Sequence, residues 1–283
     1  MSGLFDIGKS GIETYKHALS VTGQNIANAG TQGYHRREVL VAERKLTQSD
    51  SLNIQDQLGL GAEIDKVSRA FDTLSFFKLI KTNSALRSAE TVSEYLVGLE
   101  NQVTKNNQNL FSDVGELFKS LSSVQAAPNG IPERQSVLLA AEQLTNRIVN
   151  FSSELSAIKE DLSNEASILV STTNTIIDGL VEVQKSLQTV GASSFSPSSL
   201  LDQRDQLLKD LSDNLEISIQ YQNSQKVRVG LGQNFGPNDL VDGFASKQLS
   251  LTSNNGGLKF FLDGVKVDTV SGGKLGGILK AQD

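Results

Sequence analysis

The sequence predicts a mainly α-helical protein with a small β domain: an N-terminal helix, a long antiparallel coiled-coil helical rod, and then an antiparallel β domain. Three observations predict this fold class. Apolar residues recur in heptads over residues 89–190, a turn that contains two prolines interrupts the heptads at residues 128–132, and beyond residue 215 the apolar period falls to two. These patterns divide the 283-residue chain into residues 1–70, 71–190 and 191–283.

Residues 1–70 are expected to form a helix followed by an extended linker. A narrow apolar stripe runs at three- and four-residue steps and ends near Gly30, a residue type that commonly stops helices. The stripe consists of Leu4, Ile7, Gly11, Tyr15, Ala18, Thr22 and Ile26. So narrow a stripe predicts a helix that needs a packing partner. The segment REVLVAERK then alternates apolar Val39 and Val41 with polar residues, as strands do, whereas residues 45–63 show no period and are expected to be irregular.

The rod is predicted as two helices, over about residues 71–127 and 132–190. The turn APNGIPER joins them, and because it is short the two helices should form an antiparallel hairpin. The first seam consists of Ala89, Val92, Leu96, Leu99, Val103, Asn106, Leu110, Val114, Leu117, Leu121 and Val124. The second seam, which Glu165 interrupts once, consists of Val137, Ala141, Leu144, Ile148, Phe151, Leu155, Ile158, Leu162, Leu169, Thr172, Ile176, Leu180, Val183, Leu187 and Val190.

Residues 191–283 are predicted as a short helix plus an antiparallel β domain. The segment SLLDQRDQLLKDLSDN has helical spacing, with Ser199 as the expected N-cap. EISIQYQ, KVRVGLG, QLSLT and GLKFFLDGVKV alternate with period two, and Asp263-Gly264 is a strong hairpin signal. The apolar residues of GGKLGGILKAQD resemble the first turns of a returning helix, so we expect this unit to be truncated there.

The composition narrows the possible functions. A net charge of −6 argues against a nucleic-acid partner, and the absence of cysteine excludes a disulfide framework and a cysteine-type zinc site. No stretch is apolar enough to predict membrane insertion, and the N-terminus lacks the apolar run of a cleavable signal peptide. The chain is therefore expected to be cytosolic, or to leave the cell by a route that cleaves nothing.

No motif for catalysis, cofactor binding or metal binding is found. His17 and His35 are expected to be ordinary surface histidines, and the glycine-rich segments lack the GK[ST] of a phosphate loop. Asp205 and Lys209, four residues apart, are expected to pair on a solvated helix face with Arg204 beside them. No enzyme activity and no cofactor are therefore expected. An enzyme with a coiled-coil arm and an active site in the last 93 residues is the least favoured alternative.

A modest basic cluster follows the predicted first helix. Its members are Arg36, Arg37, Arg44 and Lys45. Two interpretations stay open with equal weight: a solvated extended segment, and a docking site for an acidic partner.

The segment ALSVTGQNIANAGTQGYHRREV, from residue 18, resembles the N-terminal signature of the bacterial flagellar axial family, which comprises rod, hook and filament proteins. The shared features are an asparagine-rich helix end, a Thr-x-Gly-Tyr turn and a following basic residue. They fall on Asn25, Ile26, Asn28, Thr31, Gly33, Tyr34, Arg36 and Arg37. Two further stretches are similar to hook-associated members of that family. One is GGKLGGILKAQD, and the other is LLDQRDQLLKDLS, which contains Asp202, Gln203, Arg204, Asp205 and Leu207.

The resemblance implies a structural part of the flagellum that forms a junction ring between hook and filament. It implies an extracellular location, reached through the flagellar type III export apparatus without signal cleavage. The expected partners are the hook protein, the next hook-associated protein on the filament side, further copies of the chain, and the export apparatus with its chaperone. The chaperone site is expected in the C-terminal part that is missing after residue 283. Another axial protein, from the hook, the rod or the filament side of the junction, is the alternative.

In the family, the first helix pairs with a C-terminal helix and packs against neighbouring subunits around a channel. The resemblance implies an exit point from that inner tube at Asn25, Asn28, Thr31, Gly33 and Tyr34. Gly33 would supply a backbone angle that other residues resist, and the asparagine amides would bond backbone groups of neighbours. Alternatively, Asn28 and Gly30 only cap the helix.

Overall fold

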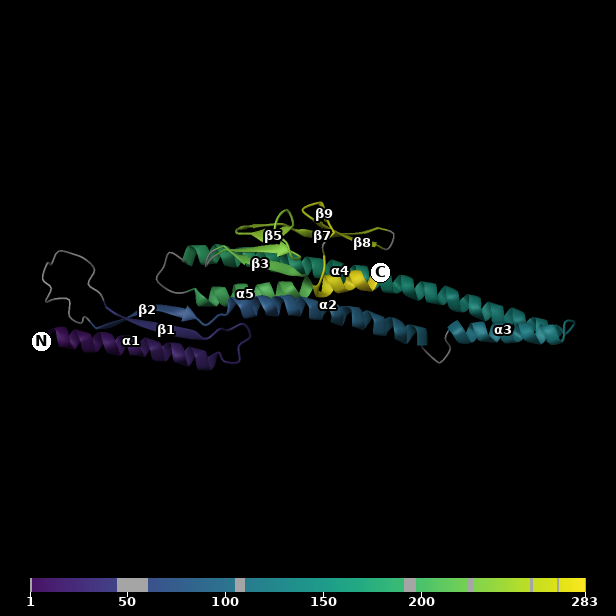
Figure 1. Ribbon diagram of the computed structural model, residues 1–283, viewed down its shortest axis with the longest axis horizontal. Coiled ribbons are helices and arrows are strands. Elements are labelled where there is room, and N and C mark those ends of the chain that lie inside the picture. Colours follow the sequence, from purple (N-terminus) through teal and green to yellow (C-terminus); the bar gives the residue numbers. More distant parts are fainter. Residues whose placement is uncertain are drawn as a thin grey trace.

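The structure is a computed structural model, which describes residues 2–44, 61–104, 110–190, 197–222, 226–254, 257–268 and 270–282. These residues form an elongated molecule in which helices build a long rod, the strands after residue 215 lie along one side of it, and the N-terminal helix and strands lie at one end (Figure 1). The predicted fold class, mainly α with antiparallel strands, is confirmed. None of the described helices combines the length and the apolarity that a membrane span requires.

The N-terminal part consists of one helix and one β hairpin. Helix α1 spans Ser2–Ala27, strand β1 spans Arg37–Glu43, and strand β2 spans Ala62–Arg69. The two strands are antiparallel, with Arg37 opposite Arg69. Strand β1 is where the alternation predicted it. Strand β2 was not predicted, and it begins inside the stretch that was expected to be irregular; residues 45–60 of that stretch lie outside the described residues.

Helix α1 packs on the hairpin with its polar side. Thr14 Oγ1 donates a hydrogen bond to the Ala62 carbonyl at 3.0 Å, and Ser10 Oγ accepts one from the Ala62 N–H at 3.3 Å. Ser10 and Thr14 are buried in this contact. The apolar side of α1 faces away from the hairpin, and its exposed large residues are Leu4, Phe5, Ile12, Tyr15, Leu19 and Ile26. An apolar face of this length on a helix marks a surface for a partner.

In the described residues, the rod comprises three helical segments. Helix α2 spans Thr73–Thr104, α3 spans Leu110–Ala126 and α4 spans Ile131–Val190. The single helix expected over residues 71–127 is therefore described as α2 and α3, and residues 105–109 between them lie outside the described part. Helix α3 packs on the outer part of α4, as the predicted hairpin requires, whereas α2 packs mainly on α6 and α5 (Figure 1). The inner rod is thus a bundle of several helices.

The buried seam of α4 differs from the predicted one. Four predicted members are buried, Leu162, Leu180, Val183 and Leu187, and the other buried residues of the inner half are Ala166, Val170, Thr173, Ile177, Val181 and Gln184. Ile148, a predicted seam residue, is 51% exposed, and Thr172 is exposed. The physical reason is that α5 and the strands cover the inner half of α4 on two sides, whereas α3 covers only one side of the outer half. Glu165, the predicted interruption, accepts a hydrogen bond from the Tyr95 hydroxyl of α2.

The predicted seam of the first rod helix is also shifted. The buried face of α2 carries Phe76, Ile80, Ser84, Ser88 and Thr91, while the predicted members Ala89 and Leu96 are exposed. These small hydroxyl residues lie against α6, where a close approach is needed. The side chains of Val103 and Asn106 lie outside the described part of the chain.

The last third of the chain adds two helices and two sheets. Helix α5 spans Ser198–Asn214 and α6 spans Gly273–Gln282. Pro197 occupies the N-cap position of α5, so Ser199 lies inside the helix and is not the cap. One antiparallel sheet has the order β3 (Ile217–Tyr221), β4 (Val227–Leu231), β5 (Asp239–Asp242) and β6 (Ala245–Ser246). The other has the order β7 (Leu249–Asn254), β8 (Gly257–Leu262) and β9 (Val265–Val267).

The hairpin between β8 and β9 lies where Asp263-Gly264 predicts it. Leu262 pairs with Val265, and φ is 48° at Asp263 and 80° at Gly264, as a two-residue turn of this type requires. Strands β5 and β6 were not predicted. The hydrophobic core lies between the inner half of α4, α5, α6 and both sheets, so the rod and the β domain share one core.

Candidate functional site: a polar joint between the N-terminal hairpin and helix α5

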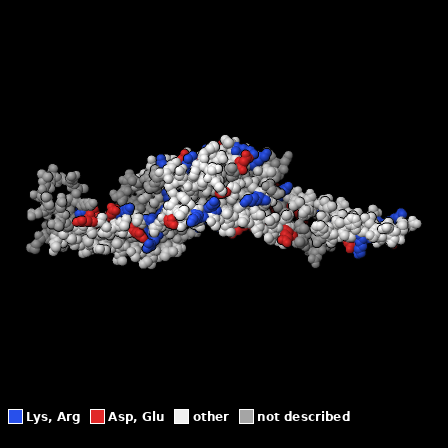
Figure 2. All heavy atoms as spheres, viewed as in Figure 1, with Lys and Arg blue, Asp and Glu red and all other residues white. Residues whose placement is uncertain are grey.

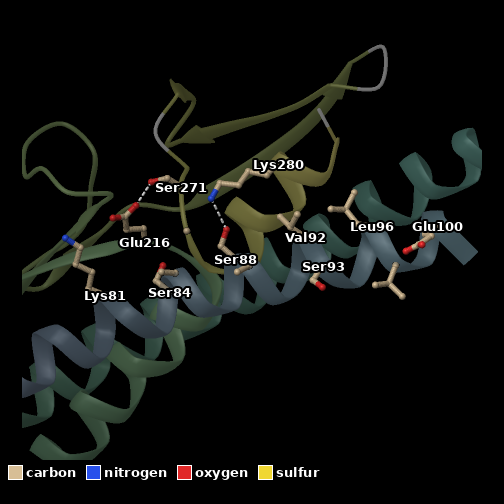
Figure 3. Close-up of a pocket in the computed structure, with 14 residues that line it drawn as sticks. Lys81, Ser84, Ser88, Val92, Ser93, Leu96, Glu100, Glu216, Ser271 and Lys280 are labelled. Carbon is tan, nitrogen blue, oxygen red and sulfur yellow. Dashed lines mark hydrogen bonds between the residues drawn. The ribbon is translucent and has the colours of Figure 1, made fainter.

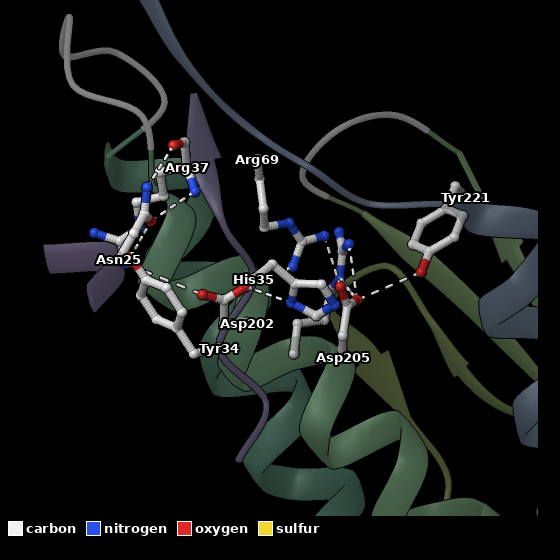
Figure 4. A network of polar contacts seen from close by, with 9 residues as sticks. Asn25, Tyr34, His35, Arg37, Arg69, Asp202, Asp205 and Tyr221 are labelled. Carbon is white, nitrogen blue, oxygen red and sulfur yellow. Dashed lines mark hydrogen bonds and ion pairs between the residues drawn. The ribbon is translucent and has the colours of Figure 1, made fainter. Parts of the chain in front are cut away.

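The N-terminal signature and the DQRDQL segment meet in space although more than 160 residues separate them. Their side chains form one connected network, which we call the polar joint (Figure 4). Its members are Asn25, Tyr34, His35, Arg37, Arg69, Asp202, Arg204, Asp205 and Tyr221. The joint is the place where α1, the β1–β2 hairpin and the rod are tied together.

Asn25 closes the turn between α1 and β1. Its Nδ2 donates to the Arg37 carbonyl at 2.9 Å, and its Oδ1 accepts bonds from the Arg37 N–H at 2.9 Å and from the Tyr34 hydroxyl at 2.8 Å. One amide thereby satisfies both backbone groups of the first strand residue. The resemblance implied amide bonds to neighbouring subunits; here these bonds of Asn25 lie within the chain.

Gly33 has the backbone angle that the turn was expected to need. Its φ is +80°, and a Cβ built there would lie 3.1 Å from Oε1 of Gln206 on α5. A positive φ strains residues that carry a Cβ. Gly30 has no such need, because its φ is not in this region and a Cβ there would meet open space. Gly33 is therefore the glycine of this turn with a conformational role.

The remaining signature residues lie outside the joint. Asn28 Nδ2 donates back to the Gln24 carbonyl at 2.9 Å, so Asn28 does cap the end of α1, and Thr31 Oγ1 bonds to Asn28 Oδ1 at 3.3 Å. Ile26 is exposed, and Arg36 pairs with Glu38 on the surface. In α5, Gln203 is exposed and Leu207 is partly buried against the core.

The basic cluster is divided by the structure. Arg36 is exposed and Arg37 joins the polar joint. The Arg44 N–H donates to the Gly61 carbonyl at 3.0 Å, and Arg44 is exposed. Lys45 lies outside the described residues. The described members thus do not form one continuous basic patch.

Three side chains of the N-terminal part, those of His35, Arg37 and Arg69, approach the carboxylate of Asp202. Oδ1 lies 2.8 Å from His35 Nδ1 and accepts a bond from Arg69 Nη1 at 3.0 Å, and Oδ2 lies 4.0 Å from Arg37 Nη2. The His35 ring also meets the ring of Phe71 edge to face, with centroids 5.2 Å apart. His35 is thus a member of the joint and not the ordinary surface histidine that was expected.

Asp205 lies deeper, with its side chain 2% exposed. Arg69 Nη2 lies 2.6 Å from its Oδ2, and Arg204 Nη2 lies 3.0 Å from its Oδ1. The predicted pair of Asp205 with Lys209 on a solvated face is therefore wrong. The physical reason is that α5 turns this face toward the hairpin and β3, where arginines meet the carboxylate, a charge-assisted arrangement that buried acids require.

Tyr221 of β3 completes the buried end of the joint. Its hydroxyl lies 3.4 Å from Asp205 Oδ1, and the Arg204 guanidinium lies 4.7 Å from the centre of its ring. Burial, followed by the negative charge of Asp205, raises the pKa of Tyr221 to about 12. The hydroxyl therefore stays protonated at physiological pH and donates its hydrogen bond.

This arrangement suits a structural connection. Both carboxylates bind arginines of the same chain, and these side chains are almost fully buried. In the described part of the chain, no group of three or more His, Cys, Asp or Glu side chains is placed to hold a metal ion. What the joint can do is fix the orientation of the N-terminal part on the rod, because buried ion pairs with several hydrogen bonds permit few alternative geometries.

A groove with a volume of about 620 Å³ runs along α2 beside α6 (Figure 3). Its floor on α2 is largely apolar, with aliphatic residues at helical spacing: Ala85, Ala89, Val92, Leu96 and Val97. At one edge Lys280 Nζ donates to Ser88 Oγ at 3.2 Å, and Ser271 Oγ donates to Glu216 Oε2 at 2.5 Å (Figure 3). Such a surface suits the packing of another helix.

Arg69 and Tyr221 were not identified as site residues from the sequence, and contact between the N-terminal signature and the DQRDQL segment was not predicted. Arg69 and Asp202 are separated by 133 residues, and no local pattern relates them. The available signal was indirect: acids next to the apolar stripe of an amphipathic helix need cationic partners when that side of the helix is buried.

The comparisons with known proteins agree with the fold. Residues 96–283 match the family described as the flagellar hook-associated protein FlgK helical domain. Flagellar hook-associated protein 1 of Bacillus subtilis is 25% identical over 225 residues, and the protein of the same name from Escherichia coli is 24% identical over 264 residues. These alignments cover 77% and 88% of this chain but 44% and 45% of the relatives, so the chain spans less than half the length of the curated relatives it matches.

A solved structure shares the architecture. The flagellar hook junction protein FlgK from Burkholderia pseudomallei superimposes with a TM-score of 0.65 at 21% identity, over 72% of this chain and 38% of that chain. This likeness shows a common fold. Since the family match covers about two thirds of the residues, the chain belongs to the family of the flagellar hook-associated protein FlgK helical domain.

Proposed function

We propose that this chain is the N-terminal part of a structural protein that forms the junction ring between the flagellar hook and the filament. One observation carries the proposal beyond family membership: α1 binds the hairpin with polar side chains and leaves its apolar face exposed. Residues of that face lie at helical spacing along most of α1. A helix arranged in this way is prepared to pack against other helices in an assembly.

The exposed face is large enough to drive assembly. Burying one large apolar side chain contributes about 1.5–3 kcal/mol. When the contact is well packed, several such side chains together exceed the rotational and translational cost of association. On the lower edge of the molecule, where α1 lies, Figure 2 shows mainly uncharged atoms. The partners that the family resemblance supports are a C-terminal helix of the same protein and α1 helices of neighbouring copies around a channel.

The further partners follow from the place in the flagellum. In this proposal the ring contacts the hook protein on one side and the next hook-associated protein on the other, and the protein reaches that place through the flagellar type III export apparatus, assisted by a chaperone. The signature residues Asn25, Thr31, Gly33 and Tyr34 would form the exit from the inner tube. The protein is proposed to be structural and extracellular, and not an enzyme.

The location can be tested directly. Antibodies against this chain are applied to flagella isolated from the organism that carries the gene, and their position is read by immunogold electron microscopy. The proposal predicts a single narrow band of label at the boundary between hook and filament. Label along the hook, the rod or the filament would contradict it and would favour another axial protein.

The role of the α1 face needs a separate test in the full-length gene. Leu19→Asp puts a charge on the apolar face, and Ser20→Asp puts the same charge on an exposed position that lies well away from that face. We expect Leu19→Asp cells to lose attached filaments, because an unpaired charge would have to be buried in the contact. Ser20→Asp cells should keep them. Equal motility of the two strains would show that the apolar face is not an assembly surface.

A further inference from the structure

We propose that Arg69 is the positioning residue that sets the direction of α1 against the rod. A chain of contacts links α1 to helix α5 of the rod. Asn25 ties the end of α1 to the first residue of β1, and the strand register places Arg37 opposite Arg69. Arg69, the last residue of β2, then reaches across to α5. A rotation of α1 relative to the rod therefore has to break or bend the contacts of Arg69.

Arg69 reaches both acids of α5 at once. Its Nη1 donates to Asp202 Oδ1 at 3.0 Å, and its Nη2 lies 2.6 Å from Asp205 Oδ2. The two acids are three residues apart on one helix and so face the same side. A planar guanidinium that holds two fixed carboxylates resists both translation and rotation, which a single point charge cannot do.

The surroundings of Arg69 restrict it further. Its side chain is 7% exposed, and the guanidinium lies 4.3 Å from the centre of the Phe71 ring. The other two groups that reach Asp202 from the N-terminal part are less buried and hold only this one carboxylate, although His35 Nδ1 lies as close as 2.8 Å. Arg37 lies 4.0 Å from the carboxylate, and both Arg37 and His35 are more exposed than Arg69. Of the side chains that cross the joint, Arg69 is thus the most constrained.

Replacement of Arg69 should change the orientation of α1 without unfolding the rod. Asp205 would keep Arg204, a residue of the same helix, and Asp202 would keep His35 and Arg37. Neither acid would be left buried without a cationic neighbour, so the rod should remain folded. Arg204 offers the matched control, because it binds the same carboxylate but belongs to the rod and stacks on Tyr221.

The consequence for assembly deepens the proposed function and rests on it. In a ring every subunit presents α1 at the same angle, so a residue that sets this angle sets how well neighbouring copies fit. The positioning role itself can be measured in the free chain, without any assembly.

The test uses the absence of cysteine from the chain. Spin labels are attached to Ser20→Cys on α1 and Glu182→Cys on α4, both exposed positions, and their separation is measured by double electron–electron resonance. A second pair, Glu142→Cys and Glu182→Cys, lies within α4 and reports whether the rod is intact. We expect one narrow distance peak between α1 and α4 in the parent chain. Arg69→Gln should replace it with a broad distribution while the pair within α4 stays unchanged.

Two control variants distinguish a loss of α1 orientation from a general loss of stability. Arg204→Gln should lower the thermal stability of the rod and leave the α1–α4 peak narrow. Arg69→Lys keeps the charge but cannot hold both carboxylates, so it should broaden the peak to an intermediate width; this variant serves the test if Arg69→Gln does not fold. An α1–α4 peak that stays narrow in Arg69→Gln, or that broadens equally in Arg204→Gln, would overturn the proposal. Neither result affects the immunogold location, so the two proposals can fail separately.

Discussion

Replacement of Gly33 by valine is the sharpest perturbation of the turn between α1 and β1. Gly33 has a φ of +80°, which a β-branched residue adopts only with strain. A Cβ at this position would lie 3.1 Å from Gln206 Oε1 and 3.6 Å from Gln206 Cβ, so the side chain of Gln206 would also have to move. Gly30, three residues earlier, has neither constraint, and Gly30→Val is the matched control.

The expected cost can be worked out from these contacts. A non-glycine residue held in such a region costs about 1–3 kcal/mol, and the flexible end of Gln206 can yield at little extra cost. Gly30→Val should change stability by no more than about 0.5 kcal/mol, as exposed substitutions do. Both variants lose the same backbone freedom in the unfolded chain, so the difference between them isolates the strain at Gly33.

The assay is hydrogen exchange at the backbone amide of Arg37. This N–H donates to Asn25 Oδ1 at 2.9 Å across the turn, so its exchange reports opening of the joint. A cost of about 1–3 kcal/mol corresponds to exchange that is roughly 5–150-fold faster. We expect this acceleration in Gly33→Val and not in Gly30→Val, with unchanged exchange in the inner half of α4. Equal exchange rates in the two variants would refute the argument that Gly33 is needed for its backbone angle.

In the full-length gene, the same substitution should prevent filament attachment. The cost is too small to unfold the rod, but it misdirects β1, and every subunit of a ring carries the same fault. We expect cells with hooks, the variant protein shed into the medium, and no attached filaments. Export is measured separately, in the medium fraction, so that a loss of export is not mistaken for a loss of assembly. Normal swimming of the Gly33→Val strain would show that the backbone angle has no role in assembly.

Two further predictions concern the rod and the buried end of the joint. Leu162→Ala should lower the free energy of unfolding by about 2–5 kcal/mol, because the Leu162 side chain is only 2% exposed. Ile148→Ala should lower it by less than about 1 kcal/mol, because Ile148, although predicted in the seam, is 51% exposed. Similar urea midpoints for the two variants would contradict the observed seam. The raised pKa of Tyr221, about 12 against an ordinary 10, means that its neutral form stabilises the fold below pH 10 and that this contribution is lost as the pH rises from 10 to 12. The stability difference between the parent and Tyr221→Phe should therefore shrink over that range in denaturation curves, and a difference that is constant with pH would argue against a buried hydroxyl.

Much of the architecture follows from local patterns. The end of α1, strand β1, helix α5 and the β8–β9 hairpin lie where their sequence signals place them, because apolar spacing, alternation and the Asp-Gly turn act within a few residues; only the predicted cap of α5, Ser199, was wrong. The long heptads of α4 likewise predict one long helix. The predicted seam is confirmed at Leu162, Leu180, Val183 and Leu187, whereas between them the buried residues Val170, Thr173 and Ile177 lie one position after the predicted ones, since heptads do not reveal how many neighbours cover a helix.

The joint could not be predicted for the same reason. The contacts between the N-terminal part and α5 join residues that are far apart in sequence. The pairing of Arg69 with Asp202 and Asp205 depends on how the hairpin folds back on α5. Local charge spacing suggested instead that Asp205 and Lys209 pair on the surface. The packing of α1 on the hairpin through its polar side was also unexpected, because a helix usually buries its apolar face. The exposure of the apolar face is explained if a further partner covers it.

In this structure the N-terminal turn and helix α5 act as one structural unit through the polar joint. A double-mutant cycle between Arg69→Gln and Asp202→Asn tests it most directly, with the free energy of opening read from hydrogen exchange at the Arg37 amide. The two side chains are 3.0 Å apart, so we predict a coupling of about 0.5–3 kcal/mol between the two substitutions. Effects that add within about 0.3–0.5 kcal/mol would show that the two segments do not depend on each other, and would contradict the account.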